Sequence, residues 1–189
     1  MELLINNEDI QQYKSVIRFM LPQYSIDPYI LESQNFDLRP ILESELFYDF
    51  INSISEYRRK KELDPVYQPT ESESKYLILL KGNNVDFMGV TPWLVYTSMA
   101  RYVPFANVTS TEYGLETKKN DYSEPITPQM AASIAGGLKE GAKVYRDDVL
   151  KFLNKNLDTY PLFKSSCHCR TDNRNSYSKA NVRFNAIGK

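Results

Sequence analysis

The spacing of apolar residues predicts a mainly helical protein. Apolar side chains recur every three or four residues, which is the period of a helix that buries one face. This period holds over about 28–38, 42–54, 70–82, 91–103 and 128–155, and a short helix near Asn7 precedes these stretches. We therefore expect a bundle of helices, the last of which is the longest.

Local signals mark where several of these helices start and stop. Asp27, Thr91 and Thr127 each precede a proline, and proline is well tolerated at the first position of a helix. Thr70 and Glu73 have the spacing of a capping box, and Gly82 stands where that helix ends. We expect Pro40 to break the helix that contains it, because it has no N–H and its ring clashes with the preceding turn. The charged stretch 57–69, which contains prolines, is expected to be a loop.

Two features interrupt this helical pattern. The segment "NVTSTEYGLETK", from Asn107, is rich in Val, Thr and Tyr and predicts a β-hairpin near 107–117 with a turn or bulge at Gly114. The longest helix contains Gly136, Gly137 and Gly141, and each costs about 1 kcal/mol relative to alanine in a helix. These glycines indicate either a close approach of another backbone or a kink.

The charge of the chain is unevenly distributed. Residues 158–189 carry six basic and two acidic side chains, so a net charge of −1 for all 189 residues leaves −5 for the rest. Hydrophobic residues make up 42% of the chain and 14 residues are tyrosine, which is enough apolar surface for a core and suits protein contacts. The acidic body and basic tail direct attention to what the tail binds.

Several function classes receive no support from the sequence. The longest apolar run, 76–80, is far shorter than the roughly 20 residues of a membrane span, and the acidic start "MELLINNEDIQQ" is not typical of a signal peptide. Cys167, His168 and Cys169 are consecutive, so in an extended chain they point to alternate sides and do not converge on one zinc ion. We find no nucleophile with an orienting base and no phosphate-binding loop. We therefore expect no enzyme activity, no cofactor and no metal, and the two cysteines favour synthesis in a reducing compartment.

The end of the chain has the pattern of a β-strand. In "SKANVRFNAIG" small or apolar residues alternate with polar ones from Ala180 to Ala186, which predicts a strand. Such a strand either pairs with the chain's own β element or adds to the sheet of a neighbour. The basic and aromatic side chains here would also suit nucleic acid, although the acidic body argues against a broad electrostatic footprint.

Five stretches carry a resemblance to a known group of proteins. "INNEDIQQY", "DPYILESQNFDLRPILESELFYDF", "TPWLVYTSMARYV", "YGLETKKNDYSEPIT" and "VLKFLNKNLDTYPLF" resemble a family of small, uncharacterised proteins of tailed phages that infect gut Bacteroidetes, including crAss-like phages. The likeness extends to about Phe163. The order of parts is also similar to that of phage head-to-tail connectors: a helical bundle, a β-hairpin excursion, a long helix and a C-terminal arm.

The resemblance implies a structural virion protein, made in the host cytoplasm and located at the junction of portal and tail. Such adaptors form a twelve-membered ring beneath the portal, bind further tail or ring proteins, and continue a channel through which DNA passes without specific binding. A small DNA-binding or regulatory phage protein is the alternative function.

The expected organisation is a helical connector domain over 1–159 and an extended basic arm over 160–189. The hairpin would contact a neighbour or the tail through Tyr113, Gly114 and Leu115. The arm would bind the portal or a neighbour through Arg170, Arg174, Tyr177, Lys179, Val182, Arg183 and Phe184.

Overall fold

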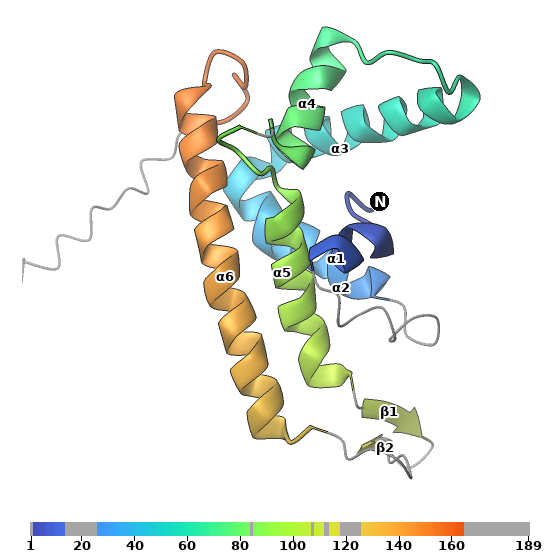
Figure 1. The fold of residues 1–189 in the computed structure, drawn as a ribbon, viewed down its shortest axis with the longest axis vertical. Helices are drawn as coiled ribbons and strands as arrows, with labels where there is room; N and C mark the ends of the chain where they lie inside the picture. Colours follow the sequence, from blue (N-terminus) through green and yellow to red (C-terminus); the bar gives the residue numbers. More distant parts are fainter. Residues whose placement is uncertain are drawn as a thin grey trace, which may run out of the picture.

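The computed structural model describes residues 2–13, 26–83, 85–106, 108–111, 114–117 and 126–164 (Figure 1). The described part of the chain is mainly helical, which confirms the prediction of a mainly α protein. Its elements are α1 (Asn7–Tyr13), α2 (Asp27–Ser33), the π-helical turn η2 (Gln34–Leu38), α3 (Arg39–Leu63), α4 (Glu71–Lys81), α5 (Thr91–Tyr102), the 3-10 turn η3 (Val103–Phe105), β1 (Val108–Thr111), β2 (Gly114–Thr117) and α6 (Pro128–Lys155).

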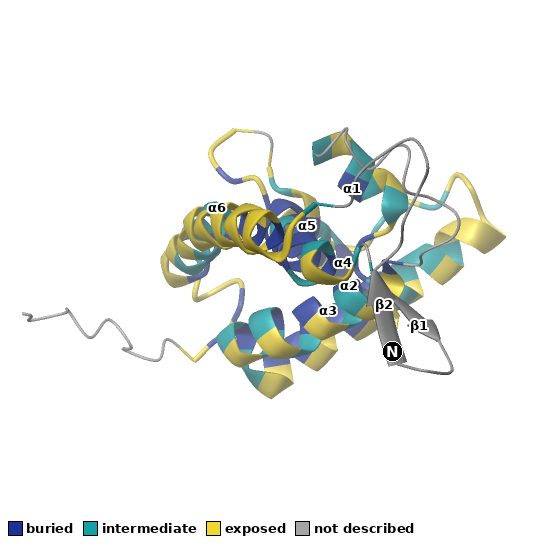
Figure 2. Ribbon diagram, turned by 90° about the horizontal axis from the view of Figure 1, so that it is seen from below, coloured by how far each residue is buried: buried dark blue, intermediate teal, exposed yellow. Residues whose placement is uncertain are grey.

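Helix α5 lies at the centre of the fold. It is buried on almost every side, between α6 on one flank and α1, α2 and α3 on the other (Figure 2). Its sequence "TPWLVYTSMARY" contains one charged residue, Arg101, which suits a helix surrounded by others. Trp93, Leu94 and Val95 are each at most 3% exposed and join the core built by α3, α4 and α6.

Helix α6 is the longer of the two helices and runs antiparallel to α5 beside it (Figure 1). Its buried residues include three alanines, Ala131, Ala135 and Ala142, and such small side chains allow neighbouring elements to pack closely. At Gly141 an added Cβ would lie 2.6 Å from the Tyr96 ring, so this glycine admits the tyrosine. The helix is continuous from Pro128 to Lys155, so the glycines do not break it, and a close approach occurs at Gly141 but not at Gly136 or Gly137, where an added Cβ would meet no atom within 4 Å.

The expected helix starts are only partly present. Thr70 and Glu73 form the predicted capping box, and the Thr127 hydroxyl accepts the N–H of Met130. The short helix expected near Asn7 is α1, and Asn6 caps it, because its side chain accepts the Asp9 N–H at 3.0 Å. The Thr91 hydroxyl does not cap α5 but donates to the Leu80 carbonyl, which ties α5 to the end of α4.

Pro40 does not end the helix that contains it, contrary to our prediction. The chain continues from α2 through η2 into α3, with Pro40 in the first turn of α3. A proline ring clashes with the carbonyl four residues earlier, and the wider π-helical turn of η2 lies at that position. The helix is instead interrupted at Glu43, where φ is 60° and ψ is 163°.

The prediction of a loop over 57–69 is wrong for its first half. Helix α3 extends to Leu63, and only residues 64–70 connect it to α4. Tyr57 and Lys60 are therefore helical. The Tyr57 ring and the Lys60 ammonium group both lie against the ring of Tyr67, which belongs to the connection. The outer half of α3 and helix α4 form a helical hairpin that projects from one end of the molecule (Figure 1).

A buried carboxylate holds this helical hairpin together. Glu73 is 5% exposed and accepts hydrogen bonds from Lys60 Nζ (2.8 Å), the Tyr67 hydroxyl (2.8 Å) and the Thr70 N–H (2.8 Å). These donors, Lys60 first, lower the pKa of Glu73 from 4.5 to about 2. The carboxylate therefore joins the C-terminal turn of α3 to the start of α4.

Replacing Glu73 by glutamine is expected to lower the free energy of unfolding at pH 7 by about 1–3 kcal/mol, because a charge-assisted set of hydrogen bonds is lost. Since the folded pKa lies below the unfolded one, the stabilisation is present above pH 4.5 and is lost as the pH falls toward 2. Urea unfolding at pH 7 and pH 3 measures both effects. Glu71→Gln, at an exposed residue of the same helical turn, is the control, and an equal loss in both variants would contradict the prediction.

The two strands follow α5 and η3 at the end of the α5–α6 pair opposite the helical hairpin (Figure 1). β1 and β2 pair antiparallel, with Val108 opposite Thr117 and Thr111 opposite Gly114. Gly114 and Leu115 thus belong to β2, while Tyr113 lies outside the described residues.

The helical body extends past the boundary expected from the sequence. We placed the start of the arm at Tyr160, yet Tyr160 is 1% exposed and Phe163 is 7% exposed, and both join the core. The Tyr160 hydroxyl donates to the Lys75 carbonyl at 2.7 Å. A separate arm therefore begins no earlier than residue 165, and 165–189 lie outside the described residues.

Candidate partner-binding groove

The arm residues named from the sequence lie outside the part of the chain that the structure describes. This holds for Arg170, Arg174, Tyr177, Lys179, Val182, Arg183 and Phe184, and also for Cys167, His168 and Cys169. Their role in binding stays a prediction. The described residues present a different candidate site.

This site is a groove of about 640 Å³, which we call the α5 groove. Its floor is made by α5 and α6, where Trp93, Thr97, Ala100 and Ala142 are each at most 9% exposed. One wall comes from η2 and the start of α3, and η3 closes one end. The volume falls within the range of pockets that accommodate a ligand or several partner side chains.

An ion pair fixes the wall against the floor. Arg101, at the end of α5, donates from Nε to Oδ2 and from Nη2 to Oδ1 of Asp37, both at 3.0 Å. Glu32 lies 3.8 Å from the same guanidinium. A two-point Arg–carboxylate contact fixes orientation as well as distance, so η2 is held in place relative to α5.

Aromatic rings stand at the mouth of the α5 groove. Phe36 is 65% exposed with the Arg101 guanidinium 5.4 Å from its ring centre, and Phe105 is 54% exposed. Phe105 is supported by Tyr29, whose ring stacks on it with the two ring centres 6.2 Å apart. Burial, and then Glu32, raise the pKa of Tyr29, so its hydroxyl stays neutral at physiological pH. Exposed aromatic rings held in place by neighbours are typical of protein contact surfaces.

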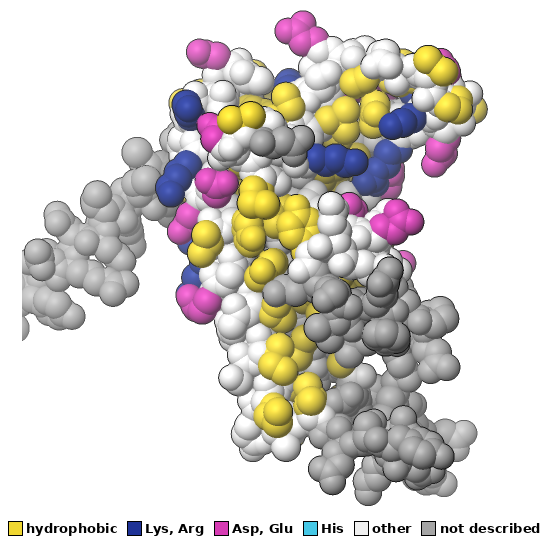
Figure 3. All heavy atoms as spheres, viewed as in Figure 1, with side chains coloured by type: hydrophobic (Ala, Val, Ile, Leu, Met, Phe, Trp, Pro, Cys, Tyr) yellow, Lys and Arg dark blue, Asp and Glu magenta, His cyan; other side chains and the backbone are white. Residues whose placement is uncertain are grey.

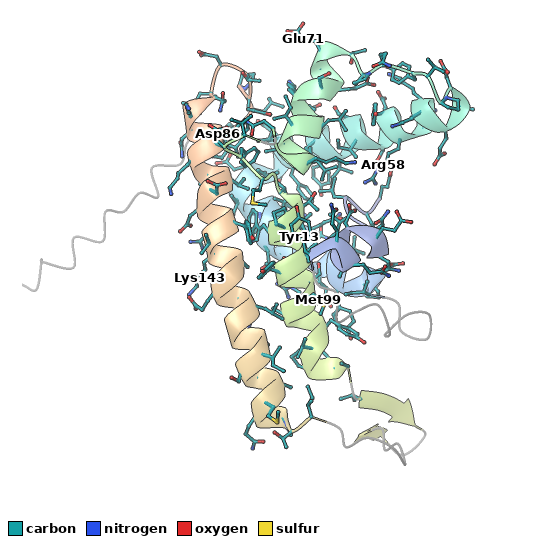
Figure 4. All side chains as sticks on the ribbon, viewed as in Figure 1. Tyr13, Arg58, Glu71, Asp86, Met99 and Lys143 are labelled. Carbon is teal, nitrogen blue, oxygen red and sulfur yellow. The ribbon has the colours of Figure 1, made fainter. Side chains whose placement is uncertain are left out.

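The opposite rim of the α5 groove is cationic. Lys139, Lys143 and Arg146 are spaced by four and three residues, so they share one face of α6. Glu140 pairs with Lys143 at 2.6 Å and Asp147 with Arg146 at 2.8 Å, whereas Lys139 makes no ion pair among the described residues. Lys143 projects outward from the edge of α6 (Figure 4). The groove thus combines an apolar floor with a basic rim.

The other flank of α6 has a different character. Met130 is 55% exposed and Ile134 is 45% exposed, and at 3.6 residues per turn Met130 lies about 180° around the helix from Lys139. A band of apolar side chains runs down the face on which α5 and α6 lie side by side (Figure 3). Helix α6 therefore separates an apolar surface from a basic one.

A second hollow, of about 620 Å³, lies at the interruption of α3. Pro40 lines both this hollow and the α5 groove. Glu43 and Lys164 line this hollow but not the α5 groove. Lys164 pairs with Glu45 at 3.2 Å. Lys164, the last residue that the structure describes, therefore lies next to the irregular turn of α3.

The described residues form neither a cluster of metal ligands nor a membrane-spanning helix. No three His, Cys, Asp or Glu side chains come together to hold a metal ion within 2–13, 26–83, 85–106, 108–111, 114–117 and 126–164. Over the same residues no helix is both long and apolar enough for a transmembrane span. What the groove offers a partner is apolar area, aromatic edges and positive charge.

Sequence reasoning did not find the α5 groove. Its defining contact joins Asp37 to Arg101 across 64 positions of the chain, and nothing local connects the two. The available signal was the single charged residue in the buried helix α5, since an arginine on such a helix requires a partner. Phe36 and Phe105 were visible only as apolar residues close to prolines.

The arrangement described above is that of a small, mainly helical protein with an antiparallel helix pair at its centre and a groove beside it. Residues 38–173 match the model of a family of unknown function, DUF6712, and the chain belongs to this family. The matched region runs from η2 through α6 and into the tail. Neither a curated protein nor a solved structure matches the chain.

Proposed function

We propose that this protein is a structural virion protein that acts as a head-to-tail connector of a tailed phage. It forms an oligomeric ring, of twelve copies by analogy with the connectors it resembles, beneath the portal. The ring links the capsid to the tail and continues the DNA channel. The observation that carries the proposal is the difference between the two flanks of α6, one apolar and one basic.

A ring requires this kind of difference. Cyclic rings of more than two subunits close through heterologous contacts, in which one surface of a subunit meets another surface of the next. The flank with Met130 and Ile134 and the flank with Lys139 and Lys143 are distinct surfaces of one helix. A protein that binds a single partner through one patch needs no second surface of this kind.

The layout of the chain supports the same proposal. The paired strands β1 and β2 lie at one end of the molecule, and we expect them to contact a neighbour or the tail through Gly114 and Leu115. Lys164, the last described residue, pairs with Glu45 of α3, and the basic residues 165–189 that follow it in the sequence would bind the portal as an arm. The acidic body suits a channel that does not hold DNA tightly.

The test of this proposal is native mass spectrometry of the full chain, alone and mixed with the portal protein of the same phage. We expect the chain to join the portal as a ring. Removing residues 165–189 is expected to abolish portal binding and leave the helical circular dichroism unchanged, because the described core lies within 2–164. A full chain that does not bind the portal contradicts the proposal. If that chain also binds duplex DNA with a steep salt dependence, the DNA-binding alternative replaces the connector function.

A further inference from the structure

The connection between α3 and α4 exposes apolar side chains at the outermost point of the helical hairpin. We call residues 62–67 the hairpin tip. Leu63 is 82% exposed and Val66 is 78% exposed, and the two are separated by Asp64 and Pro65. Single exposed apolar residues are common on protein surfaces, so their exposure alone has no functional meaning.

The hairpin tip is nevertheless held by several hydrogen bonds. Asp64 ends α3 by donating its N–H to the Lys60 carbonyl at 2.9 Å, and its side chain accepts the Val66 N–H at 3.0 Å. The Tyr67 N–H donates to the Asp64 carbonyl at 3.0 Å, and the Tyr67 hydroxyl donates to buried Glu73. Leu63 and Val66 are thus presented on a fixed backbone, which lowers the entropic cost of binding through them.

The charge of the hairpin tip complements the rim of the α5 groove. Glu62 and Asp64 flank Leu63 and are both exposed. The groove has an apolar floor at Trp93, and its acids Glu32 and Asp37 face Arg101 on the wall. On the opposite rim Lys139 makes no ion pair among the described residues, and Lys143 pairs with Glu140 of its own helix. An apolar tip with two acids therefore matches an apolar groove with basic residues on one rim.

The two surfaces face different sides of one molecule. In Figure 4 Arg58 marks the projecting helical hairpin on one side, and Lys143 marks the edge of α6 on the other. A tip that projects on one side cannot fill a groove on the far side of the same copy. It is placed to reach a neighbour, and a repeated tip-to-groove contact is heterologous.

We propose that the hairpin tip of one copy seats in the α5 groove of the next copy, with Leu63 and Val66 on the apolar floor and Glu62 and Asp64 beside the basic rim. The inference rests on the proposed ring, for which it names the subunit contact. It makes the buried Glu73 network a support of assembly, since that network holds the tip in its binding conformation.

The first experiment compares assembly of the full chain and of two variants with the portal protein, by native mass spectrometry over a range of protein concentrations. We expect the double variant Leu63→Asp, Val66→Asp to need at least about tenfold more protein for half-maximal ring formation, because central apolar anchors dominate interface affinity. Val85→Asp changes an 89% exposed side chain outside the hairpin tip and is expected to assemble as the unchanged protein does. Thermal unfolding checks that each variant is folded.

A charge exchange tests the orientation of the contact. Glu62→Lys and Lys143→Glu are each expected to weaken assembly. The chain that carries both of these changes is expected to recover at least part of the loss, because the new charges again have opposite signs.

A disulfide provides a second readout. In a background with Cys167→Ser and Cys169→Ser, one copy with Val66→Cys and one with Phe36→Cys are expected to cross-link when mixed in the ring.

The outcomes separate this inference from the function on which it rests. A ring that forms equally well with the aspartate variants, or that gives no Val66→Cys to Phe36→Cys cross-link, overturns the tip-to-groove contact and leaves the connector function standing. A full chain that forms no ring with the portal overturns the connector function, and the contact proposed for that ring with it.

Discussion

Replacing Gly89 by alanine is expected to lower the free energy of unfolding by about 2–6 kcal/mol, through backbone strain together with a steric clash. Gly89 has φ of +80°, a region that side-chain-bearing residues rarely adopt. An added Cβ would lie 2.4 Å from the Leu80 carbonyl oxygen and 2.5 Å from the Gly82 nitrogen. Both are backbone atoms, so the clash cannot be relieved by turning a side chain.

The turn at Gly89 also positions two hydrogen bonds that connect α4 to α5. The Val90 N–H donates to the Leu79 carbonyl at 2.9 Å, and the Thr91 hydroxyl donates to the Leu80 carbonyl at 2.7 Å. These bonds join the end of α4 to the start of the central helix α5. Moving the chain at Gly89 would break the contacts that orient α5, on which the α5 groove is built.

Gly136→Ala is the matched control for this prediction. An added Cβ at Gly136 meets no atom within 4 Å, and the residue is helical, so alanine is expected to stabilise the fold by about 0.5–1 kcal/mol. Urea unfolding of the two variants therefore gives changes of opposite sign. A Gly89→Ala protein as stable as the unchanged chain would show that the turn does not need its left-handed conformation.

The elements that were predicted correctly depend on local chemistry. The Thr70–Glu73 capping box, the Thr127 cap and the stop at Gly82 all involve residues within a few positions of one another. Such signals act on the chain before any tertiary contact forms, so they can be read from the sequence. The long periodic pattern of α6 belongs to the same class, because one amphipathic helix defines its own buried face.

The elements that were missed depend on tertiary contacts. Charged residues make 57–69 resemble a loop, yet Arg, Lys and Glu are also good helix formers and α3 continues to Leu63. The partner of Lys60 in this helix, Glu73, comes thirteen residues later in the sequence. Pro40 would end an isolated helix, but the helix continues through the π-helical turn η2, from which Asp37 reaches Arg101. The α5 groove has no sequence signature for the same reason, since its walls come from separate segments.

The end of the body gives the last prediction. A chain that stops at Thr159 is expected to lose about 3–5 kcal/mol of unfolding free energy for each of Tyr160 and Phe163, which amounts to loss of the fold for a domain of typical stability. Tyr160 packs between Tyr76 and Phe152, at ring distances of 6.2 Å and 5.9 Å, and burial raises its pKa to about 12.

The matched comparison is a chain that stops at Lys164, which keeps every residue of the described core. We expect this chain to unfold at the same temperature as the full protein and the chain ending at Thr159 to show no cooperative transition. Equal melting of the two shortened chains would contradict the role assigned to Tyr160 and Phe163. The difference also decides how portal binding is tested, because a deletion from residue 160 would remove core and arm together, whereas a deletion from residue 165 removes the arm alone.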